Sequence, residues 1–173
     1  MEWSYPLRFV SAAAVLWYFR QSYKNMDWRF SWLGPLLGAV VFGLWIGLDR
    51  LSGGGDDKAI AGGLASLPDA GRVAWLTFRV LAAVVAVPIA EELAFRGFLI
   101  RRLASADFDS LPAKTFTWLA VVVSSVAFGL MHGDRWIAGS VAGLLYAATF
   151  LRRGRIGEAV AAWVLAGNNW RFW

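Results

Sequence analysis

The sequence predicts an all-α fold, a polytopic transmembrane helical bundle of about 5–6 helices. Of the 173 residues, 58% are hydrophobic and only 17% are charged, and the apolar residues gather into runs separated by charged or glycine-rich breaks. A hydrocarbon core of ~30 Å takes about 20 helical residues, and a helix satisfies its own backbone there. The 11 tryptophans, many of them near the ends of apolar runs, are typical of membrane–water interfaces. Membrane lipids are therefore the predicted surroundings of this chain.

The composition also excludes several classes of protein. The chain has no cysteine, which removes a disulfide framework, a thiolate nucleophile and a zinc–thiolate site. Its net charge is +5, but lysine and arginine are scattered between apolar runs, which fits juxtamembrane anchoring and not nucleic-acid binding. The N-terminus lacks a basic region before its apolar stretch, so we interpret it as a retained membrane segment and not a signal peptide.

The first 72 residues are predicted to form an N-terminal transmembrane hairpin and a glycine-rich loop. The first helix covers about residues 7–19 and ends at Arg20, and the second covers about residues 32–48 and ends at Asp49. The following segment is rich in glycine and contains paired aspartates and Pro68, a composition that favours a flexible connection.

Residues 73–173 are predicted to form the helical core. Its first helix runs from about residue 73 to 103, ~46 Å at 1.5 Å per residue, with a kink at Pro88. Two antiparallel helices, 116–131 and 136–151, follow around a Gly-Asp-Arg turn. The final helix, from Ile156, has only about ten apolar residues, or about half a crossing, so it looks incomplete.

Basic residues in the short loops predict the orientation. Residues 20–29, 96–114 and 152–155 fall on one side of the predicted bundle. The positive-inside rule makes that side cytoplasmic.

Three ionisable residues interrupt one apolar run and require partners. Glu91, Glu92 and Arg96 lie in the predicted helix 73–103, and charges at that depth cost several kcal/mol, about 2.5–3.5 each on insertion scales, unless they are paired or hydrated. Glu92 and Arg96 are four residues apart on one face and can form an ion pair, whereas Glu91 is turned ~100° away. Either the three form a polar knot that fixes helix packing, or Glu91 is left free for chemistry.

His132 is the only histidine and follows Phe128 by one helical turn. On spacing alone it fits an interfacial capping group. Beside a buried glutamate it would also suit hydrolysis, with Glu91 as the general base toward water and His132 as a proton donor or oxyanion partner. A divalent metal such as zinc ranks second, because catalytic zinc usually has three protein ligands and no HEXXH pattern is present. A proton-coupled carrier would need internal repeats, which we do not find.

The strings EELAFRGFLIRRL and FGLMH, in this order on consecutive apolar helices, resemble the first two motifs of the CAAX prenyl protease and bacteriocin-processing family. The later strings DRWIAGSVAGLLYA and RRGRIGEAVAA are similar to its exosortase-associated branch. The resemblance implies a membrane endopeptidase without a cofactor in the bacterial inner membrane, acting on a peptide or membrane-protein substrate, with exosortase-system proteins as partners. It implies Glu91 as the base, Glu92 and Arg96 as its support, and Phe128 with His132 as the second block.

One part of the family pattern is missing. The family normally adds a second histidine on a late helix, with asparagine or a similar residue four positions later; here Trp163 and Gly167 stand at those positions. A segment missing after Ala162 would explain both this departure and the short last helix. The alternative function is a non-catalytic membrane immunity or protein-sorting factor on the same scaffold.

Overall fold

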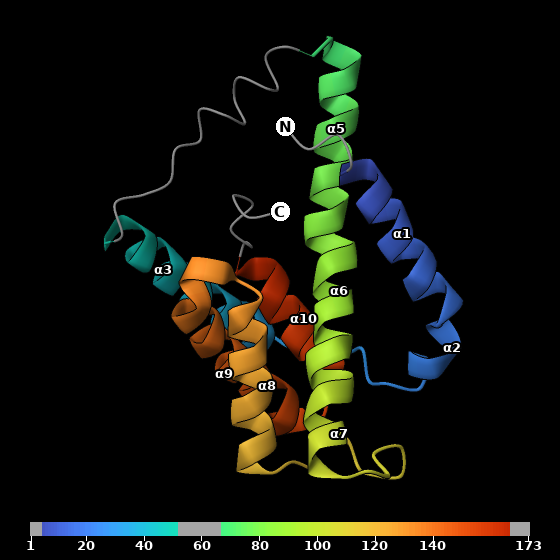
Figure 1. The fold of residues 1–173 in the computed structure, drawn as a ribbon, viewed down its shortest axis with the longest axis vertical. Helices are drawn as coiled ribbons and strands as arrows, with labels where there is room; N and C mark the ends of the chain where they lie inside the picture. Colours follow the sequence, from blue (N-terminus) through green and yellow to red (C-terminus); the bar gives the residue numbers. More distant parts are fainter. Residues whose placement is uncertain (1–4, 52–66, 167–173) are drawn as a thin grey trace.

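The computed structural model describes residues 5–51 and 67–166, and the regular elements within these ranges are helices (Figure 1). The glycine-rich loop over residues 52–66 and Gly167, Asn168 and Asn169 lie outside the described residues. The elements are α1 (Tyr5–Tyr18), α2 (Arg20–Tyr23), α3 (Leu33–Leu51), α5 (Asp69–Leu81), η1 (Ala82–Ala86), α6 (Val87–Glu92), η2 (Leu93–Leu99), α7 (Ile100–Ala104), α8 (Trp118–Leu130), η3 (Gly133–Arg135), α9 (Trp136–Arg153) and α10 (Ile156–Leu165). The predicted all-α class is confirmed for the described part of the chain.

Elements α5 to α7 form one continuous helix of 36 residues, from Asp69 to Ala104 (Figure 1). The predicted helix 73–103 is therefore confirmed, with a start four residues earlier, directly after Pro68. Its two π-helical segments, η1 and η2, were not predicted. Pro88 has no backbone N–H to donate to the α-helical hydrogen bonds. The segment η1 lies just before it, and there the bonds join residues five apart instead of four, such as that from Val87 N to the carbonyl of Ala82. The chain thus passes the proline with a changed hydrogen-bond pattern and remains helical.

The other predicted helices are present with shifted ends, but most are short. Among the described residues, one helix, Asp69–Ala104, is long and apolar enough to cross a membrane, whereas five had been predicted. Helix α8 is one of the shorter ones: Thr117 caps it by accepting a hydrogen bond from Ala120 N at 3.1 Å, and it ends at Leu130 after 13 residues. The described part of the chain is therefore all-helical.

Helices α8 and α9 are antiparallel and touch through small residues. A Cβ on Gly139 would lie 2.9 Å from the Cα of Gly129, and one on Gly143 would lie 3.1 Å from the Cα of Ser125. These separations leave no room for a side chain. Small residues spaced four apart therefore allow the two helix backbones to approach closely. The GXXXG pattern of α9 therefore acts as a packing face.

Helix α10 is held against α3 by a second glycine face. A Cβ on Gly34 would lie 2.7 Å from the carbonyl oxygen of Glu158, and one on Gly38 would overlap the carbonyl of Ala162. Glu158 is fully buried and accepts hydrogen bonds from Ser31 Oγ at 2.9 Å and from Gly34 N at 3.1 Å. The position of α10 is thus set by backbone contact with α3 and by a buried carboxylate.

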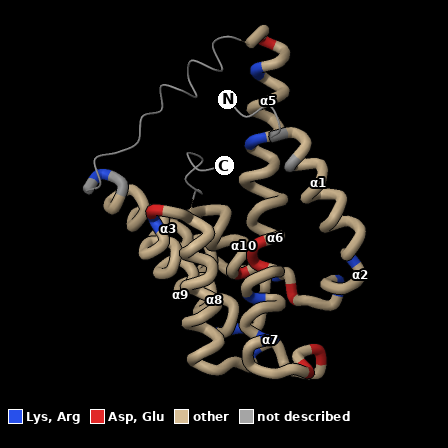
Figure 2. The backbone as a smooth tube through the Cα atoms, viewed as in Figure 1, with Lys and Arg blue, Asp and Glu red and all other residues tan. Residues whose placement is uncertain are grey.

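The three basic segments that were predicted to share one side do meet at one end of the molecule. Asp27 forms an ion pair with Arg155 at 3.3 Å, and a Cβ on Gly154 would lie 3.2 Å from the side chain of Lys114. Hydrogen bonds from Arg29 hold the pKa of Asp27 well below its usual range. Figure 2 shows Lys and Arg near α2 and α7 at this end.

The long helix has different neighbours on its two sides. Helix α1 packs against α5 and η1, whereas α10 packs against η1, α6 and η2, and α8 packs against η2 and α7. In Figure 1, α1 and α2 lie on one side of the long helix, and α3, α8, α9 and α10 lie on the other. The α6–α7 half therefore packs against α8 and α10, and the α5 half packs against α1 and extends beyond the other helices.

Candidate active site

The centre of the bundle contains an ion pair on the long helix. Arg96 Nη1 lies 2.9 Å from Glu92 Oε1, and the two side chains are 1% and 0% exposed. Their four-residue spacing predicted this pair. The sequence did not predict that Arg96 lies within the π-helical segment η2.

Arg96 links the long helix to α8 and α9. Its Nη2 donates to the carbonyl of Gly143 at 2.8 Å, and its guanidinium lies 4.6 Å from the ring centroid of Phe128 and 5.3 Å from that of Tyr146. Gly143 is the residue whose missing side chain lets α8 and α9 approach. Arg96 therefore joins helix packing to the buried charge of Glu92.

Phe128 connects this ion pair to His132. The rings of Phe128 and His132 have centroids 4.8 Å apart, and the Nδ1 atom of His132 lies 2.9 Å from the carbonyl oxygen of Phe128. A carbonyl only accepts, so Nδ1 must carry the proton in this hydrogen bond. In the neutral ring Nε2 is then the unprotonated nitrogen. Trp45 of α3 covers the histidine, with ring centroids 5.8 Å apart.

The side chain of Glu91 is bonded to another helix, whereas that of its neighbour Glu92 is bonded within the long helix. Its Oε2 accepts a hydrogen bond of 2.9 Å from the indole Nε1 of Trp163 in α10. Glu91 and Trp163 are 7% and 2% exposed, so water competes little for this bond. The two adjacent acids thus have separate partners, an arginine for Glu92 and a tryptophan for Glu91.

Glu91 and His132 are separated by similar lengths of chain from one end of the bundle. The long helix and α8 both reach this end, which is formed by α7 and the start of α8 (Figure 1). Glu91 lies 13 residues before Ala104 and His132 lies 14 residues after Trp118, which are about 20 and 21 Å of helix. Within the described residues, Glu91 and His132 share no hydrogen bond or ion pair.

Three polar atoms in this cluster have no hydrogen-bond partner within the described residues: Glu91 Oε1, Glu92 Oε2 and Arg96 Nε. All three are buried, and buried polar groups are normally paired with protein or water. The two carboxylate oxygens can therefore accept a hydrogen bond from water, and the guanidinium N–H can donate one to water or to a substrate carbonyl.

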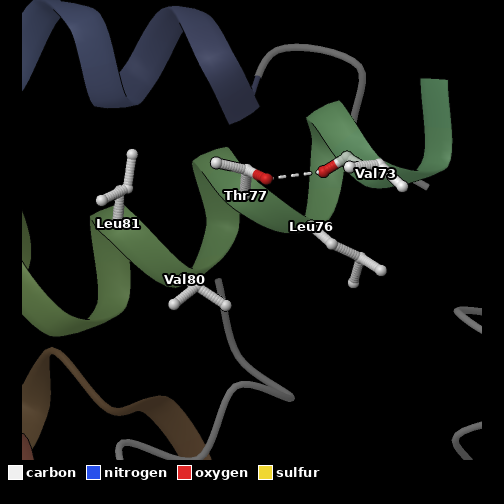
Figure 3. Close-up of a pocket in the computed structure, with 5 residues that line it drawn as sticks. All are labelled: Val73, Leu76, Thr77, Val80 and Leu81. Carbon is white, nitrogen blue, oxygen red and sulfur yellow. Dashed lines mark hydrogen bonds between the residues drawn. The ribbon is translucent and has the colours of Figure 1, made fainter. Parts of the chain in front are cut away.

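An apolar groove on α5 lies outside this cluster. It is lined by Val73, Leu76, Thr77, Val80 and Leu81, and the hydroxyl of Thr77 is bonded to the carbonyl of Val73 (Figure 3). No lining residue is ionisable, and Leu81 is ten residues before Glu91, about 15 Å along the helix. This groove carries no catalytic group.

No cluster of three or more metal-ligating side chains occurs in the part of the chain that the structure describes. Glu91 and Glu92 are adjacent but bonded to residues on different elements. The divalent metal considered from the sequence would need further ligands.

The sequence did not indicate that Tyr146, Trp45 and Trp163 belong to this cluster. Tyr146 follows Gly143 by three positions on α9, so the face of the GXXXG pattern could have indicated it. Trp45 and Trp163 reach the site from helices distant in sequence. No local spacing predicts such contacts.

The comparison with protein families identifies the region that carries this cluster. The family described as "Type II CAAX prenyl endopeptidase Rce1-like" matches residues 73–168, more than half of the 173 residues. No curated protein and no solved structure matches the chain. The match covers Glu91, Glu92, Arg96, Phe128 and His132. This chain belongs to the Rce1-like family of type II CAAX prenyl endopeptidases.

Proposed function

We propose that this chain is an intramembrane endopeptidase of the CAAX type, in which Glu91 activates a water molecule that hydrolyses a peptide bond near the membrane. The observation that carries the proposal is the geometry of Glu91. Its carboxylate is buried in the family-matched region, one oxygen is fixed by Trp163, and the other has no partner among the described residues. This leaves one oriented oxygen for a general base.

The proposed reaction begins with transfer of a proton from water to Glu91 Oε1. The water oxygen forms a bond to the carbonyl carbon of the peptide, and the carbonyl oxygen becomes an oxyanion. When the carbonyl re-forms, the C–N bond breaks and the proton passes from Glu91 to the leaving amine. The atoms balance with one water and one peptide bond, without an additional reactant.

In this proposal His132 acts through Nε2, since its Nδ1–H is bonded to the carbonyl of Phe128. The neutral ring offers Nε2 as an acceptor for water, and a protonated ring offers it as a donor to the oxyanion. Glu92 acts with Arg96 as the support of the site. Their ion pair and the bond from Arg96 to Gly143 fix the long helix against α9.

We also propose that the bundle is embedded in a membrane as a polytopic protein. Helix α8 is inverted relative to a water-soluble protein: Ser124 and Ser125 are buried, while Leu119 and Leu130 are 73% and 63% exposed. In the helix Asp69–Ala104, only 28% of the apolar window is buried inside the molecule. These exposed apolar faces fit contact with lipid.

We also propose, from the sequence, the location, the family branch and the division of the chain. The location is the bacterial inner membrane, and the branch is the exosortase-associated one, with exosortase-system proteins as partners. The chain is divided into residues 1–72 and 73–173. The substrate is proposed to be a peptide or membrane protein cut near the membrane.

The test is cleavage of a farnesylated CAAX peptide by the purified protein in detergent. Glu91→Gln should reduce kcat by about 10²–10⁴-fold, the usual contribution of general base catalysis. Asp69→Asn is the control, because it makes the same carboxylate-to-amide change on the same helix at an exposed position 22 residues before Glu91. Unchanged cleavage by folded Glu91→Gln would overturn the role of Glu91.

A specific observation favours the second candidate, a non-catalytic membrane immunity or protein-sorting factor. His132 is the only histidine of the chain, and the residue bonded to Glu91 is a tryptophan, which donates a hydrogen bond but does not exchange protons. This function predicts that Glu91→Gln leaves the biological phenotype unchanged and that the wild type cleaves no CAAX peptide.

A further inference from the structure

Trp163 is the residue on another helix that holds the candidate base. Its indole N–H reaches Glu91 Oε2 at 2.9 Å across a separation of 72 residues. The bond joins α10 to α6, and both side chains are buried. Hydrogen bonds to an ionised group are stronger than neutral ones.

The chemistry of an indole suits a fixed partner. The indole N–H donates one hydrogen bond and has no acceptor atom. It can occupy one carboxylate oxygen, and it cannot take the proton that a general base receives. Oε1 is the oxygen without a partner among the described residues, so Trp163 determines which oxygen of Glu91 is available.

The backbone around Trp163 keeps the indole in place. Ala162, the preceding residue, touches Gly38 of α3 so closely that a Cβ on Gly38 would overlap its carbonyl. Trp163 is 2% exposed and belongs to the main hydrophobic core. The packing around the ring therefore keeps the indole N–H directed at Glu91.

We infer that Trp163 is a positioning residue for Glu91: it holds Oε2 so that Oε1 is presented to the reacting water. This inference rests on the proposed function. It assigns to Trp163 the selection of the reacting oxygen, with no direct contact to the substrate.

The test removes the N–H group and preserves the shape of the side chain. Trp163 is replaced by benzothienylalanine, which has sulfur in place of the N–H, and in a second variant by phenylalanine (Trp163→Phe). The buried Trp75 of α5 receives the same isostere as the matched control, because it lies 16 residues before Glu91, about 24 Å along the helix. Thermal unfolding in detergent checks that each variant is folded.

The first measurement is labelling by dicyclohexylcarbodiimide, a hydrophobic reagent that attaches to carboxyl groups in apolar surroundings. Peptide mass spectrometry locates the label, and Glu91→Gln provides the blank. We expect Glu91 to be labelled about tenfold faster when the isostere is at position 163, which is the effect of losing one charge-assisted hydrogen bond. The isostere at position 75 should leave the rate unchanged.

The second measurement is cleavage of the farnesylated peptide. The isostere at position 163 should lower kcat about tenfold with KM unchanged, because it disturbs the base and not the binding of substrate. Unchanged labelling of Glu91 and unchanged kcat in the folded isostere variant would overturn the inference. If the wild type cleaves nothing, the proposed function fails, and the labelling rate still decides whether Trp163 holds Glu91.

Discussion

The two halves of the helix Asp69–Ala104 each carry an ion pair, and the two pairs differ in burial. In α5, Asp69 and Arg72 lie 3.5 Å apart with side chains 95% and 42% exposed. At the junction of α6 and η2, Glu92 and Arg96 lie 2.9 Å apart with almost no exposure. An exposed pair contributes ~0–1 kcal/mol, whereas removing one member of a buried pair costs about 3–5 kcal/mol. Two ion pairs on the same helix, whose members are three and four residues apart, thus contribute differently to stability according to their burial.

The largest expected effect is that of Arg96→Met. It leaves Glu92 buried without its counter-charge and removes the bond to Gly143, so the free energy of unfolding in detergent should fall by about 3–5 kcal/mol. Arg102→Met, an exposed arginine on α7, is the control. The double variant Glu92→Gln with Arg96→Met should recover part of the loss. A loss below about 1 kcal/mol for Arg96→Met would remove the contrast between the two halves.

An intermediate effect is expected for Gly38→Ala, which tests how firmly α10 is held beside α6. The new methyl group would overlap the carbonyl of Ala162, and overpacking of this kind costs about 1–3 kcal/mol. Gly43→Ala on the same helix has nothing within 4 Å of its new Cβ and should raise stability by roughly 0.5–1 kcal/mol through helix propensity. Equal effects of both variants on thermal unfolding would show that α3 and α10 are not in backbone contact.

The smallest effect is expected for Asp69→Asn in the exposed pair. The loss of an exposed charge in the first turn of a helix should change the free energy of unfolding by less than ~1 kcal/mol. The same variant should keep the wild-type rate of peptide cleavage, since Asp69 is 22 residues before Glu91. A larger change in either measurement would show that the α5 half is coupled to the site.

The elements that depend on local pattern could be predicted from the sequence. The apolar runs predicted the helices, and the four-residue spacing predicted the pair of Glu92 and Arg96. The π-helical segments could not be predicted, because a change in the backbone hydrogen-bond pattern leaves no period in the sequence. The ends of the helices could not be predicted from the apolar runs alone: Phe116 belongs to the apolar run of α8, but the helix begins only after the capping residue Thr117.

The candidate site was predicted only where its members are close in sequence. Glu91, Glu92 and Arg96 share one segment, and Phe128 and His132 share another, so their spacing indicated two blocks. How these two blocks lie relative to each other depends on how the long helix packs against α8, which is a tertiary property. The contact of Trp163 with Glu91 is also tertiary. The sequence therefore showed Trp163 only as the residue that stands in place of the family's second histidine, with no indication that it would bind Glu91.

The bond between α6 and α10 also has a consequence for biosynthesis. Translation makes Glu91 72 residues before Trp163, roughly 4–14 s earlier at 5–20 residues per second. During that interval Glu91 is already part of an apolar segment, and its indole partner has not yet been synthesised. The hydrogen bond that orients the carboxylate can therefore form only after α10 has been synthesised, so the site stays incomplete until the last described helix leaves the ribosome.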